Sequence, residues 1–89
     1  MINIGYGNYI NGNKVLAIVR PDAAPTKRMV QFARDKGQCI DATGGRKCKS
    51  VIVTGGMQIV LSALLPETVA KRCNSFVDDE NAVSEDDTL

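Results

Sequence analysis

The residues best suited to do chemistry lie in one short run, Ala42 to Lys49, which contains a Gly-Gly pair followed by cations. The pair stands between two apolar, strand-like stretches, and glycine reaches the positive φ angles that tight hairpin turns need. The pattern predicts a hairpin that holds its cations in solvent at the tip, where they can bind phosphate oxygens without being desolvated in a core. The cations of this run are Arg46, Lys47 and Lys49.

The other interpretation of this run is a solvated turn that only aids solubility. Binding is favoured because the cations crowd a glycine turn instead of alternating with acids, and because Lys14 begins another strand-like run with no acidic residue nearby. Arg46 is also the cation most able to reach a base edge, since its planar fork matches guanine. The basic residues Lys27, Arg28 and Arg34 are interpreted as the ordinary solvated face of a helix.

The net charge of +1 conceals two segments of opposite sign. Residues 1–73 contain eleven basic and four acidic residues, which gives 11 − 4 = +7, whereas residues 74–89 contain six acidic and no basic residues, which gives −6. A body that basic attracts polyanions. We expect residues 1–73 to form one DNA-binding domain and the acidic residues 74–89 to form a disordered tail.

Catalytic and metal chemistry find little support in this composition. The chain has no histidine, and its three cysteines, Cys39, Cys48 and Cys73, have no metal-ligand spacing. The neighbouring lysines could lower the pKa of Cys48, but no partner base is evident that would make it a nucleophile. We therefore expect no enzyme, no cofactor, no metal and no small-molecule ligand.

The cysteine spacing also indicates a reducing compartment, because it fits neither a disulfide framework nor a zinc site. The N-terminus lacks the pattern of a signal peptide. No apolar stretch approaches the roughly 20 residues that a membrane-spanning helix needs. These features predict a cytoplasmic protein without a membrane partner.

At 89 residues the chain has room for one small domain. Helices are expected at 25–36, where Pro25 suits the first turn and Gly37 the C-terminal cap, and from Pro66 to about Cys73. The fold class is therefore α+β, with a small, mainly antiparallel sheet, two helices and hairpin turns at both Gly-Gly pairs. Strand-like segments are 2–4, 9–10, 14–19, 39–42, 47–54 and 57–61.

Several segments of the chain together resemble the RemA family of bacterial extracellular matrix regulators. The resemblance spans roughly residues 2–72 and implies a DNA-binding transcriptional regulator of biofilm matrix genes, associated with the nucleoid. It also implies a ring-shaped homo-oligomer against which duplex DNA can wrap. The segments that carry it are 2–8, 19–21, 24–28, 33–37, 40–43, 45–47 and 66–70.

The resemblance implies DNA contacts at Lys14, Arg46 and Lys47, which match basic positions important in the family, with Lys49 in support. Two of the three family arginines are lysine here, so charge is kept but the bidentate fork is lost. Gly44 stands where relatives often carry a tyrosine. An RNA-binding module associated with translation and a purely structural oligomer are the alternative functions.

Overall fold

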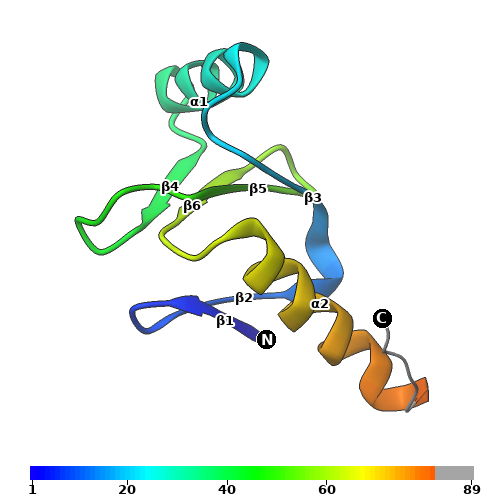
Figure 1. The fold of residues 1–89 in the computed structure, drawn as a ribbon. Helices are drawn as coiled ribbons and strands as arrows, with labels where there is room; N and C mark the ends of the chain where they lie inside the picture. The colour runs from blue at the N-terminus through cyan, green and yellow to red at the C-terminus, as the bar shows by residue number, and fades with distance from the viewer. Residues whose placement is uncertain (82–89) are drawn as a thin grey trace.

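The computed structural model describes residues 1–81, with side-chain surroundings as far as residue 74 (Figure 1). Its elements form two sheets, one 3-10 turn and two helices, and their order along the chain agrees with the expected α+β class. The elements are β1 (Ile2–Gly5), β2 (Asn8–Ile10), η1 (Gly12–Lys14), β3 (Val15–Val19), α1 (Ala24–Asp35), β4 (Cys39–Ala42), β5 (Ser50–Thr54), β6 (Ile59–Ser62) and α2 (Pro66–Asn81).

The main sheet has the strand order β3-β5-β6-β4, and β1 pairs with β2 in a separate hairpin. β3 and β6 both run antiparallel to β5, whereas β4 runs parallel to β6, with Cys39 opposite Ile59 and Ala42 opposite Ser62. The sheet is therefore mainly antiparallel, as predicted, with one parallel edge strand. The predicted turn at the second Gly-Gly pair is also confirmed, because Gly55 and Gly56 connect the antiparallel strands β5 and β6.

The hairpin predicted at Gly44-Gly45 is wrong, although the tight turn itself is present. The N–H of Arg46 donates to the carbonyl oxygen of Thr43 at 3.1 Å, and Gly44 and Gly45 take φ angles of 64° and 81°. The flanking strands do not pair, because β6 lies between β4 and β5. β5 also begins at Ser50 and not at residue 47.

The reason for this arrangement lies in burial. Every residue of β6 is buried, and Val51 and Ile52 of β5 are fully buried, so these two strands need neighbours on both sides. β4 exposes Ile40 and Asp41 and takes the edge, which solvent can reach. Local alternation along the chain carries no information about this choice of partner.

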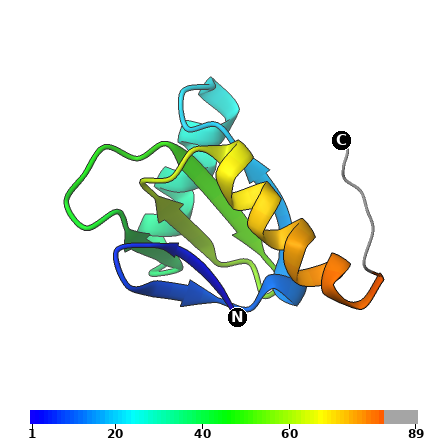
Figure 2. The same ribbon diagram turned by 60° about the horizontal axis from the view of Figure 1, so that its bottom comes forward.

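The sheet is covered on both faces (Figures 1 and 2). On one face, α1 buries Ala33 against Val51, Ile59 and Leu61. The opposite face carries the β1–β2 hairpin and α2, which contribute Ile2, Ile4 and Val69 to a cluster with Ile52 and Val60. The core is therefore a pair of apolar layers separated by one sheet.

Both helices begin where predicted, within one residue, and α1 also ends there. α1 ends in a Schellman motif, in which Gln38 N–H donates to the Ala33 carbonyl at 2.8 Å and Gly37 N–H to the Arg34 carbonyl at 3.1 Å. Gly37 takes the left-handed conformation that this motif needs, with φ 72°. α2 continues past the predicted end at Cys73 to Asn81, and the rest of the expected tail, 82–89, lies outside the described residues. Neither helix of the described chain has the length and apolar character that crossing a bilayer requires.

Candidate nucleic-acid interface

The turn that carries the basic run, which we call the basic turn (residues 43–49), is anchored at its base by Asp41 and Thr43. The Asp41 carboxylate accepts hydrogen bonds from the hydroxyl of Thr43 at 2.6 Å and from its backbone N–H at 2.9 Å. These two bonds, with a smaller contribution from the positive charge of Arg34, lower the pKa of Asp41 from its usual 3.8. Thr43 is buried, so the turn leaves the sheet from a fixed point.

The far end of the basic turn is also fixed. Lys49 N–H donates to the carbonyl oxygen of Ser62 at 2.9 Å, which begins the pairing of β5 with β6. Between these anchors the side chains of Arg46, Lys47 and Lys49 are exposed, as predicted. The structure thus brings three cations together on one projecting loop, at the end of the sheet where β4 and β6 finish (Figure 2).

Lys14 lies at the opposite end of the sheet. It ends η1 and precedes Val15, which is opposite Thr54, whereas the basic turn precedes Ser50 at the other end of β5. The four residue steps of β5 between them span roughly 13 Å at about 3.3 Å per residue. Lys14 is exposed, but within one subunit it is not part of the cluster formed by Arg46, Lys47 and Lys49.

Tyr6 lies beside the basic turn, although nothing in the sequence marks it as part of this site. It lies in the turn between β1 and β2, and the Cζ atom of Arg46 is 4.8 Å from the centroid of its ring. This is within the range of a cation–π contact. The segment Gly5-Tyr6-Gly7 predicts a turn but gives no signal for this contact, which joins residues distant in sequence.

Cys48 lies on the α1 side of the basic turn, in a shallow groove of about 290 Å³ that Lys27 and Arg34 also line. Burial raises the pKa of its thiol, outweighing hydrogen bonds that act in the other direction. The suggestion that the lysines on either side lower this pKa is therefore wrong, because the thiol packs inward and donates to the Ser50 carbonyl at 3.3 Å. Lys27 and Arg34, interpreted from sequence as a plain solvated face, lie beside the basic turn.

These groups are suited to holding phosphate oxygens. Exposed guanidinium and ammonium groups supply several donors on a fixed loop, and the half-buried Cys48 thiol, with its raised pKa, is a poor nucleophile at neutral pH. Among the residues that the structure describes, no three His, Cys, Asp or Glu side chains gather as metal ligands. The arrangement defines a small α+β protein with a projecting cationic turn.

This chain belongs to the RemA-like family, described as extracellular matrix regulatory protein A-like, whose family model matches residues 1–73. A relative from Lachnoclostridium phytofermentans, named "Putative regulatory protein", is 62% identical over 74 residues, covering 83% of this chain and 81% of the relative. Proteins of the same name from Clostridium beijerinckii and Acetivibrio thermocellus are 51% and 47% identical, covering 98% and 96% of this chain and 94% and 98% of their own lengths. The names are those of regulatory proteins and not of enzymes.

Proposed function

We propose that this protein is a DNA-binding transcriptional regulator of biofilm matrix genes, associated with the nucleoid, that contacts the phosphate backbone of duplex DNA. The observation that carries the proposal is the exposure of Arg46, Lys47 and Lys49 on one anchored turn. The +7 charge of residues 1–73 adds a long-range attraction for a polyanion. Lys and Arg side chains in such contacts position a duplex, and only Arg46 has the planar fork that can also read a guanine edge.

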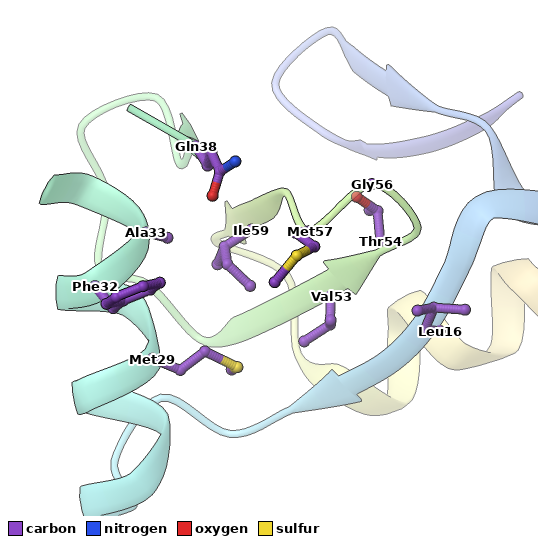
Figure 3. A pocket seen from close by; sticks show the side chains of 10 residues that line it. All are labelled: Leu16, Met29, Phe32, Ala33, Gln38, Val53, Thr54, Gly56, Met57 and Ile59. Atoms are coloured by element: carbon purple, nitrogen blue, oxygen red, sulfur yellow. The ribbon is translucent and has the colours of Figure 1, made fainter. Parts of the chain in front are cut away.

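Exposed apolar surface supports assembly into a homo-oligomer. On the α1 side of the sheet, a groove of about 240 Å³ is bordered by Leu16, Phe32 and Met57, with exposed fractions of 72%, 58% and 71% (Figure 3). Phe32 lies on the same side of α1 as Met29 and the buried Ala33, yet it remains exposed at the rim of this groove. Apolar groups this exposed are typical of a surface that another protein covers.

A second apolar surface lies on the hairpin side of the sheet, where Tyr9 and Ile40 are exposed and border a wider groove with Lys14. The two surfaces differ in composition, lie on opposite faces and meet at the β5–β6 turn, since both include Thr54 and Gly56. Two different surfaces on one subunit suit a head-to-tail contact, which closes into a ring when the rotation permits. We therefore propose a second copy of this chain as the occupant of the Leu16 groove, in a ring that repeats the basic turn.

The test is the salt dependence of duplex binding by the full chain. If an assembly neutralises 6 to 10 phosphates, affinity should fall about 10³- to 10⁵-fold between 50 and 200 mM salt. Arg46→Ala with Lys47→Ala should abolish binding and keep the assembly. The matched control is Arg28→Ala with Lys71→Ala, which removes the same charge from exposed positions that do not border the basic turn and should change binding much less.

The outcomes separate the competing functions. A flat salt dependence would refute the phosphate mechanism. Stronger competition by RNA than by duplex DNA would identify an RNA-binding module. Dissociation of the Arg46/Lys47 variant into monomers would identify a structural oligomer whose cations serve subunit contacts.

A further inference from the structure

The backbone of Tyr6 holds its ring in an unusual place. Tyr6 takes a left-handed conformation, with φ 54°, which is uncommon for a bulky residue. Its ring is about half exposed and lies against Arg46, whose guanidinium carbon is 4.8 Å from the ring centroid. Positive φ at both Tyr6 and Gly7 is what a two-residue hairpin turn between the paired Gly5 and Asn8 requires, and glycine would meet that requirement with less strain than tyrosine. The tyrosine at this position therefore needs a reason besides the turn, and its contact with an exposed cation supplies one.

Side-chain hydrogen bonds of Asn8 join the β1–β2 turn to the base of the basic turn. The amide nitrogen of Asn8 donates to the carbonyl oxygens of Gly5 at 3.0 Å, Tyr6 at 3.3 Å and Ala42 at 3.3 Å. Ala42 is the last residue of β4 and directly precedes the basic turn. One side chain therefore fixes the position of the Tyr6 backbone relative to the loop that carries Arg46.

Gly44 makes room for the ring. A Cβ atom at this position would lie 3.2 Å from Cγ of Tyr6, closer than ordinary van der Waals contact, and the φ angle of 64° also disfavours any other residue. The Tyr6 ring thus occupies the space beside residue 44 and reaches Arg46 two positions further along. The ring, the glycine and the arginine form one unit, built from two separate turns.

We infer that Tyr6 is a positioning residue for DNA binding. Its ring, which occupies the space beside Gly44, holds the Arg46 guanidinium in one orientation. The inference rests on the proposed function. A ring against one face of the guanidinium leaves the N–H groups at its edge free for a phosphate or a guanine. Because the side chain is ordered before binding, less conformational entropy is lost when DNA arrives.

The first test needs no DNA. The Nε–Hε signal of Arg46 is followed by NMR in the full-length wild-type protein, where the ring should shift it from the values of the other arginines. Tyr6→Phe keeps the ring and should keep the shift, whereas Tyr6→Leu should abolish it. Gly44→Ala, which pushes on the ring without removing it, should move the same signal. An Arg46 signal that is unchanged in Tyr6→Leu would overturn the inference.

The second test measures affinity for a duplex of about 30 base pairs at 50 mM salt. Tyr6→Phe should bind like the wild type, and Tyr6→Leu about 2- to 5-fold more weakly for each engaged subunit, the size expected of an exposed cation–π contact. In an Arg46→Ala background, Tyr6→Leu should have no further effect, because the residue that it positions is gone. An equal loss in both backgrounds would show that Tyr6 acts independently of Arg46 and would overturn the inference.

The two proposals fail in different ways. Lack of duplex binding by the wild-type protein refutes the proposed function, and the NMR comparison then still decides whether Tyr6 orients Arg46. Thermal unfolding of Tyr6→Leu and Tyr6→Phe identifies any general loss of structure. A shift that persists without the aromatic ring refutes the positioning role even if DNA binds tightly.

Discussion

Leu16→Lys is expected to break the proposed subunit assembly while leaving the fold intact. Leu16 lies where the pairing of β3 with β5 shifts register, since Val15 is opposite Thr54 and Ala17 opposite Val53. This irregularity makes Leu16 an extra residue in the strand, and 72% of it remains exposed at the rim of the groove. An exposed leucine contributes little to the stability of one subunit, so its effect should appear in assembly.

The magnitude follows from that exposure. Full burial of a leucine side chain stabilises by about 1.5–3 kcal/mol, so covering the 72% that is still exposed adds about 1–2 kcal/mol at each subunit contact. Loss of this burial energy weakens the affinity at each subunit contact about 5- to 30-fold, and the cost of burying a lysine charge weakens it further. The free energy of unfolding of the subunit should change by no more than about 0.5 kcal/mol, as for other exposed sites.

Sedimentation velocity across a range of protein concentrations measures this effect. The matched control is Leu65→Lys, because Leu65 is 51% exposed and borders neither apolar groove. The wild type and the Leu65 variant should sediment alike, and the Leu16 variant should sediment as a smaller species. If the Leu16 variant keeps the wild-type size at all concentrations, the groove is not a subunit contact.

Two further predictions concern stability. The pKa of Asp41 is lowered in the folded state, chiefly by the Thr43 hydroxyl. The ionised carboxylate therefore stabilises the fold above its usual pKa of 3.8, and this stabilisation is lost as the pH falls through the folded value. Thermal unfolding between pH 6 and 2 should therefore show the advantage of the wild type over Asp41→Asn shrinking below about pH 4; a constant difference would contradict this. Ser62→Ala removes a buried hydroxyl that donates to the Ile4 carbonyl at 2.8 Å and should cost about 1–3 kcal/mol in urea unfolding. Ser50→Ala is the paired control, because Ser50 lies opposite Ser62 and its hydroxyl is buried without a partner among the described residues. This variant should lose less stability, and equal losses in the two variants would show that the Ser62 hydrogen bond does not stabilise the fold.

The elements that sequence patterns predicted are those fixed by local physical chemistry. α1 begins near Pro25 and ends before Gly37 because the missing N–H of proline and the positive φ of glycine act within one turn of the chain. The Gly55–Gly56 turn is likewise determined by residues next to one another in the chain. The pairing of β4 with β6 is determined by tertiary structure, because it depends on which strands must be buried on both faces.

The same distinction applies to the candidate interface. Exposure of Arg46, Lys47 and Lys49 could be predicted, since charged side chains beside a glycine turn have little reason to be buried. The position of Lys14 at the far end of the sheet could not be predicted, because it follows from the antiparallel pairing of β3 with β5. The contact between Tyr6 and Arg46 also depends on tertiary structure, through the Asn8 hydrogen bond that joins the hairpin to β4.

Three positions match the basic positions of the family: Lys14, Arg46 and Lys47. The contact with Tyr6 offers a reason why the second of them is arginine while the other two are lysine. A planar guanidinium stacks on a ring and keeps its edge donors free, whereas an ammonium group is a point charge that gains less from such a platform. Arg46 has the platform and is the arginine, and Lys47, beside it on the turn, needs only charge to reach a phosphate. Lys14 borders the second apolar surface, so its distance from any basic turn depends on how subunits meet. In the proposed head-to-tail ring, a duplex would meet an oriented arginine from each subunit, with lysines that follow its backbone between them, and affinity would come from repetition of a weak contact.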